Sequence, residues 1–105
     1  MRNRQIGGRI QLKIISRRKS LEMCAEAGWF AFDFLLDGRM DRDFILSLRP
    51  LGSFVFLSTL RQPFFKIETA HYILKGIQGA DFFRMAVPGD CLQDVDRIVR
   101  YVNGA

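Results

Sequence analysis

The first nineteen residues of this chain carry seven positive charges and no negative charge. The cations are Arg2, Arg4, Arg9, Lys13, Arg17, Arg18 and Lys19, and the first acidic residue is Glu22. Because the whole chain has a net charge of +5, the residues after Lys19 sum to −2. A basic end on a mildly acidic body indicates either a polyanionic partner or a segment with a separate purpose.

The densest part of this basic segment directly precedes Ser20, which is a good N-cap for a helix. If a helix begins there, three cations lie beside the free backbone N–H groups at its positive end, an arrangement that binds phosphate or carboxylate. The alternative is a solvated basic loop, eased by Glu22. The candidate residues for binding nucleic acid or another anion are Arg9, Lys13, Arg17, Arg18 and Lys19.

Two fragments of known RNA-binding motifs occur, and neither carries a function over. RNA-recognition modules stack bases on aromatic residues of two central strands, but the first predicted strand has none and only Phe54-Val55 fits the third. Gly76 to Gly79 resembles the GxxG loop of KH domains, and we interpret Gly79 as a helix end instead. Any contact with nucleic acid is therefore expected to be electrostatic and tolerant of sequence.

The sequence offers little for catalysis or metal binding. His71 is the only histidine, and we expect it on the solvent side of a helix near Lys75. Cys24 and Cys91 are interpreted as small buried apolar residues in a reduced compartment. A metal site would need His71 and both cysteines to converge with an acid, and no pair has the spacing of a known ligand motif. We predict no catalytic residue, no metal and no cofactor.

The 105 residues are expected to form one α+β domain, with residues 1–8 as a basic N-terminal arm. No uncharged run is long enough to cross a bilayer, and no secretory signal follows the charges, so we predict a cytoplasmic protein. An organellar transit peptide would also be rich in Arg, but the strand pattern of 9–14 favours a folded segment. All ten Phe lie between Phe30 and Phe83, more apolar surface than a two-layer core hides.

Alternation of polar and apolar residues predicts a first strand at 9–15, with Ile10, Leu12 and Ile14 buried. Apolar and acidic residues at helical spacing predict a helix over 20–37, and a strand over 29–36 is the alternative. Strands are predicted at 43–49 and 53–60, around a type I turn at 49–52. Residues 64–68 form either a short strand or the start of a helix.

A helix is predicted from Ala70, capped by Thr69 and ended by Gly79, and then a strand over 81–87. A closing helix runs from a capping box at Asp90 and Gln93 to Asn103-Gly104. Its apolar stripe consists of Leu92, Val95, Ile98, Val99 and Val102. The order β-α-β-β-α-β with an additional C-terminal helix predicts a ferredoxin-like split βαβ sandwich of two layers.

These observations favour a small non-enzymatic binding or assembly module, acting as a homo-oligomer or as a subunit of a larger complex. The apolar excess and the lack of a catalytic constellation support that interpretation. The alternative is a protein that binds nucleic acid or a phosphate ligand through its basic N-terminal segment. A small enzyme with an unrecognised site is the third interpretation.

Overall fold

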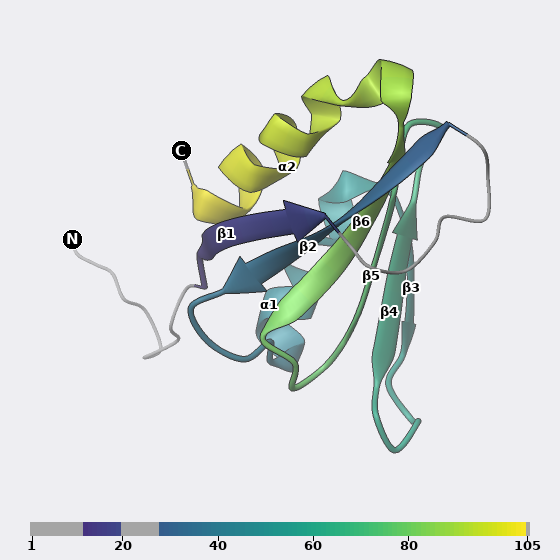
Figure 1. The fold of residues 1–105 in the computed structure, drawn as a ribbon. Helices are drawn as coiled ribbons and strands as arrows, with labels where there is room; N and C mark the ends of the chain where they lie inside the picture. Colours follow the sequence, from purple (N-terminus) through teal and green to yellow (C-terminus); the bar gives the residue numbers. More distant parts are fainter. Residues whose placement is uncertain (1–11, 20–27, 105) are drawn as a thin grey trace.

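The computed structural model describes residues 12–19 and 28–104 (Figure 1). The strands are β1 (Ile14–Lys19), β2 (Trp29–Leu36), β3 (Ser53–Leu57), β4 (Phe64–Glu68), β5 (Ile73–Ile77) and β6 (Phe82–Pro88). The helices are α1 (Arg42–Leu46) and α2 (Gln93–Asn103), and the short 3-10 helices are η2 (Arg49–Leu51) and η3 (Gly89–Cys91). Within the described ranges, no helix has the length and apolar character needed to cross a membrane.

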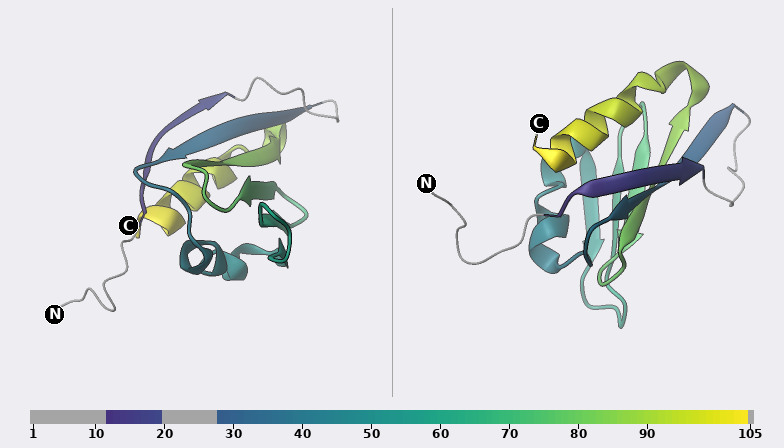
Figure 2. Two further views of the ribbon diagram at one scale, coloured as in Figure 1. Left: turned by 90° about the horizontal axis from the view of Figure 1, so that it is seen from below. Right: turned by 60° about the vertical axis from the view of Figure 1, so that its left-hand side comes forward.

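All six strands form one antiparallel sheet in the order β1-β2-β6-β5-β4-β3. The sheet curves around α1 and α2, which lie together on its concave side (Figure 2). Both helices bury apolar residues in the same core cluster as β2, β4, β5 and β6. In the described part of the chain, the opposite face of the sheet is therefore covered by neither helix, and we call it the open face.

The prediction of a ferredoxin-like split βαβ sandwich is wrong. Residues 29–36 form strand β2, which was the alternative to a helix over 20–37, and residues 20–27 lie outside the described part. The segment after Ala70 forms strand β5 rather than a second long helix. The two central elements that would have made the helical layer of a ferredoxin-like fold are thus strands of the sheet.

The helical pattern around β5 misled because both faces of this strand carry apolar residues. Thr69 caps the following residues as it would cap a helix: its Oγ1 accepts hydrogen bonds from the N–H groups of His71 and Tyr72 at 3.0 and 3.1 Å. The chain then enters β5 instead of continuing the turn. Gly76 allows close packing there, because a Cβ at this position would lie 2.8 Å from the Phe65 ring.

The segment predicted as a strand over 43–49 contains α1 instead. Asp41 caps the helix by accepting a hydrogen bond from the Phe44 N–H at 2.8 Å, and Phe44 and Ile45 are buried one after the other. The predicted turn at 49–52 is the 3-10 helix η2, with Pro50 near its start. The predicted strands at 53–60, 64–68 and 81–87 are confirmed as β3, β4 and β6, although β3 ends at Leu57.

The first strand lies later in the chain than predicted. β1 begins at Ile14, and the predicted start at Arg9 is outside the described residues. Arg17, Arg18 and Lys19, expected in a loop, belong to β1. The helix start predicted at Ser20 also lies outside the described part of the chain.

The closing helix is confirmed as α2, which buries Val95, Ile98 and Val102. Gly104 ends it with a φ of 75°, a left-handed conformation that favours glycine. The predicted capping box is wrong, because Asp90 lies in η3 and Leu92 occupies the N-cap position without a side-chain hydrogen bond. Asp96, expected to pair with Arg100, forms an ion pair with Arg17 at 3.2 Å.

The core lies between the concave side of the sheet and the two helices. Phe34 and Phe83 meet at its centre, with ring centroids 5.4 Å apart, and Phe65 is fully buried beside them. Because α1 and α2 share one side, this core takes in a large part of the Phe content. Phe30 and Phe82 are 37% and 36% exposed, so some aromatic surface still faces outward.

Candidate functional site

A row of charged side chains crosses five strands of the open face. Residues directly opposite each other in antiparallel strands point to the same face of a sheet. Arg18 lies opposite Asp33, Asp33 opposite Arg84, Arg84 opposite Lys75, and Lys75 opposite Lys66. We call these five residues the cationic row, because four of them are basic and one is acidic.

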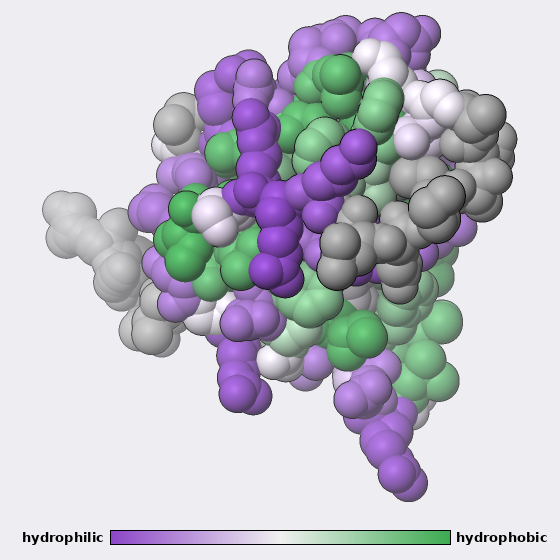
Figure 3. Space-filling model, in the orientation of Figure 1, coloured by the Kyte–Doolittle hydropathy of each residue, from purple (hydrophilic) through white to green (hydrophobic). Residues whose placement is uncertain are grey.

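An apolar row runs beside the cationic row on the same face. It consists of Leu35, Phe82, Ile77, Phe64 and Leu57. Of these residues, Leu57, Ile77 and Phe82 are 46%, 41% and 36% exposed, which is high for large apolar side chains. Hydropathy colouring shows apolar surface along β3 and β4 and hydrophilic surface over β1 (Figure 3).

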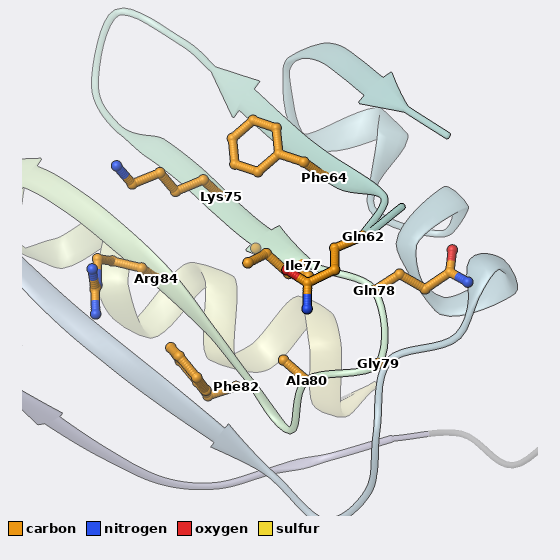
Figure 4. A pocket seen from close by; sticks show the side chains of 10 residues that line it. Gln62, Phe64, Lys75, Ile77, Gln78, Gly79, Ala80, Phe82 and Arg84 are labelled. Atoms are coloured by element: carbon orange, nitrogen blue, oxygen red, sulfur yellow. The ribbon is translucent and has the colours of Figure 1, made fainter. Parts of the chain in front are cut away.

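The two rows border a groove of about 690 Å³, a volume within the range of ligand-binding pockets. Its lining includes two aromatic residues, two cations and two amides: Phe64, Phe82, Lys75, Arg84, Gln62 and Gln78. Lys75 and Arg84 lie at one end of the groove, and the rings of Phe64 and Phe82 lie on either side of Ile77 (Figure 4). The groove thus offers positive charge at one end and aromatic faces beside it.

Ion pairs neutralise part of the cationic row and position one member. The Arg84 guanidinium donates two hydrogen bonds to the carboxylate of Asp33, through Nε at 2.7 Å and Nη2 at 3.4 Å. Lys66 lies 3.5 Å from Glu68, with both side chains largely exposed. Lys75 makes no ion pair with another described residue. The four cations therefore exceed the two carboxylates by two charges.

The sequence-predicted anion-binding residues are dispersed rather than gathered into one patch. Only Arg18 joins the cationic row, because Arg17 and Lys19 lie opposite Phe34 and Phe32 and point to the helix side of the sheet. Arg9 lies outside the described residues. The anion-binding role of this segment stays a prediction.

Three of these basic residues make contacts within the fold. The Lys13 ammonium donates to the carbonyl of Asn103 at 3.1 Å, near the end of α2. Arg17 pairs with Asp96 on α2. The ammonium of Lys19 lies 5.5 Å from the centre of the Phe30 ring, a cation–π contact. These contacts help to hold β1 and α2 together, so a phosphate would compete with them.

Sequence reasoning missed Lys66, Lys75 and Arg84 as members of one surface. Each alternates with apolar residues in its own strand, which is the local signal of an exposed position. Their alignment across β4, β5 and β6 depends on strand order and register, which no local pattern contains. The helix predicted from Ala70 removed Lys75 from the sheet altogether.

The two edges of the sheet differ in how they are protected against pairing with another chain. β1 carries Arg17, Arg18 and Lys19 and has a register shift between Ile14 and Ser16. Charges and bulges of this kind block edge-to-edge association. β3 contains no charge and no proline, pairs with β4 alone among the described strands, and has Val55 48% exposed.

A second cluster of polar side chains lies at the other end of β5 from the groove. It contains His71, Cys91 and Asp94. Cys91 is a free cysteine and half-buried, not the fully buried residue we expected. Partial burial and the nearby Asp90 carboxylate raise the pKa of the Cys91 thiol. A raised thiol pKa is the opposite of what an activated cysteine nucleophile needs.

Comparisons of this chain with protein-family models, with curated proteins and with solved structures found no match. Function must therefore be argued from the surfaces themselves. The groove is the surface where charge, aromatic rings and concave shape coincide in the described part of the chain.

Proposed function

We propose that the protein is a non-enzymatic binding module whose open sheet face binds single-stranded nucleic acid. The observation that carries this proposal is the groove, in which Lys75 and Arg84 lie beside the exposed rings of Phe64 and Phe82. Proteins that bind single strands combine a positively charged groove with aromatic side chains on which bases stack. Cations at one end fit a phosphate, and the rings fit the attached base.

Two features favour a single strand over a duplex. The faces of paired bases are stacked inside a duplex and are closed to Phe64 and Phe82. The two amides of Gln62 and Gln78 lie toward the end of the groove away from the cations (Figure 4), where the edge of an unpaired base would find hydrogen-bond partners. Because the row has an excess of only two charges, we expect a salt dependence of roughly two phosphate contacts.

A fluorescence anisotropy titration with a labelled single-stranded oligonucleotide tests this proposal. Phe82→Ala is expected to cost about 1 kcal/mol or more of binding free energy, a loss of affinity of about fivefold. Lys75→Glu should weaken binding and flatten the dependence on salt by about 0.7 per lost phosphate contact. Arg100→Glu, a matched charge reversal on α2, should leave the titration nearly unchanged.

Absence of binding at low salt would refute the proposal. Binding that Lys75→Glu and Arg100→Glu reduce equally would show that net charge, and not the groove, holds the nucleic acid. Equal affinity for a duplex of the same length would remove the role of the exposed rings.

The β3 edge supports a second candidate function, assembly of copies of this chain. Two β3 strands that pair across a two-fold axis would extend the sheet and bring uncharged residues together. The same pairing through β1 would bring Arg17, Arg18 and Lys19 of both copies together, so the charges favour β3. Light scattering of the purified protein should then show a dimer.

Val55→Lys is the matching variant, because its side chain is already half exposed and the change places a charge at the unprotected edge. It should yield a monomer that keeps its fold. Ile15→Lys, the same change at a 64% exposed residue on β1, should leave the dimer intact. A parent protein that is monomeric at micromolar concentration would contradict the assembly proposal.

A further inference from the structure

His71, Cys91 and Asp94 bring three different metal-binding atoms together from three separate segments. His71 lies in the turn between β4 and β5, Cys91 ends η3, and Asp94 lies in the first turn of α2. A ring nitrogen, the sulfur and a carboxylate oxygen all lie within 4.8 Å of one another. The closest printed approach joins His71 Nδ1 to Asp94 Oδ2 at 3.6 Å.

The fold holds the segments that carry these residues in place. The backbone N–H of His71 donates to Thr69 Oγ1, and the neighbouring Tyr72 hydroxyl donates to the Leu51 carbonyl at 2.6 Å. On the other side, β6 leads directly through η3 into α2. Neither partner is near His71 in the sequence, so tertiary structure alone produces the cluster.

The buried carboxylate provides an independent sign of a ligand. Asp94 is only 2% exposed, and its Oδ2 atom accepts no hydrogen bond from the described residues. Its other oxygen, Oδ1, lies 3.6 Å from Arg97. Buried carboxylate oxygens normally have a hydrogen-bond or metal partner. Oδ2 is also the oxygen that faces His71, so the unsatisfied atom points into the cluster.

We propose that His71, Cys91 and Asp94 bind a divalent transition metal, with Zn²⁺ as the best match. Imidazole, thiolate and carboxylate are the three side-chain ligands that zinc uses. A tetrahedral site with bonds of about 2.0–2.3 Å separates its ligand atoms by about 3.3–3.6 Å. The nitrogen–oxygen distance already lies near that range, and the exposed His71 side chain is free to close the longer distances.

Three protein ligands leave a fourth position for water or an external ligand. The site lies at the opposite end of β5 from Gln78 and the groove, so it does not depend on nucleic-acid binding. A bound metal would link the β4–β5 turn to the start of α2. The proposal therefore adds a binding site and a connection between two segments of the fold.

Titration of the reduced protein with Co²⁺ alone tests this proposal. Cobalt in a tetrahedral site with a thiolate ligand gives intense visible bands and a near-ultraviolet sulfur-to-cobalt charge-transfer band. We expect both bands to saturate at one equivalent of cobalt and to disappear when Zn²⁺ is added, because zinc binds such sites more tightly. Cys91→Ser should abolish the charge-transfer band.

His71→Ala should lower cobalt affinity at least tenfold, and its exposed position keeps the variant folded, which circular dichroism checks. Asp96→Asn on the same helix removes an equal charge and should leave affinity unchanged. No band with excess cobalt would overturn the proposal. A charge-transfer band that persists in Cys91→Ser would overturn it as well, because the thiolate would then be a different one.

Discussion

Gly76→Ala distinguishes the observed strand from the predicted helix by the sign of its effect. In the interior of an exposed helix this change stabilises by about 1 kcal/mol, because alanine loses less conformational entropy than glycine. In strand β5 the new Cβ would lie 2.8 Å from Phe65 Cε1, 3.1 Å from Phe65 Cζ and 3.1 Å from Phe83 Cβ. Two fully buried rings must then move.

Overpacking of this kind typically costs about 1–3 kcal/mol. In a domain of this size, each kcal/mol corresponds to about 4–8 °C in the melting temperature. We therefore expect Gly76→Ala to lower Tm by roughly 5–20 °C and to lower the free energy of unfolding in urea to match. The backbone itself adds no strain, because Gly76 is not among the described glycines with positive φ.

A double-mutant cycle locates the cost. Phe65→Leu removes the two ring atoms closest to the new Cβ, so the double variant should be more stable than the sum of the two single changes predicts. A parent-like or raised Tm in Gly76→Ala would refute the packing argument. Strict additivity with Phe65→Leu would show that the strain arises elsewhere.

Two further predictions concern the core and the titration of a buried phenol. Ile98 is fully buried in α2, so Ile98→Asp should cost about 4 kcal/mol or more and leave the chain largely unfolded by circular dichroism, whereas a Tm within about two degrees of the parent would show α2 to be peripheral. Burial, and secondarily Asp94, raises the pKa of Tyr72 above its ordinary value of 10.0. The folded state therefore favours the protonated phenol, so the free energy of unfolding should fall as pH rises above about 10. Tyr72→Phe should remove this part of the decline, and an unchanged slope in urea titrations would contradict the assignment.

The elements that the sequence predicted correctly are those whose pattern fits one period. The stripe of α2 fits only a helix, and β3, β4 and β6 alternate clearly. The pattern fails where both sides of a strand are apolar, as in β2 and β5, because such residues also match helical spacing. In α1, the buried Phe44 and Ile45 are adjacent, so a short helix resembled a strand.

The candidate sites were less predictable than the elements. Arg18 was identified from local charge density, but its partners in the cationic row come from β4, β5 and β6 and meet through register. His71 and Asp94 were separated by a strand, two turns and η3, and a metal motif requires ligands at recognisable spacing. Sequence reasoning detects clustering along the chain, whereas both sites depend on clustering across it.

The position of β6 has a consequence for the order of folding. β6 lies between β2 and β5, so the hairpin of β1 with β2 and the meander of β3, β4 and β5 are joined within the sheet only through it. While the chain is being synthesised, the inner edges of β2 and β5 lack their partner until residues 82–88 emerge. The two subassemblies must then be closed in one late step, in which α2 follows at once and covers Phe83 and Met85. A chain halted before Phe82 would therefore present two unpaired sheet edges and an uncovered core, the state in which aggregation competes most strongly with folding.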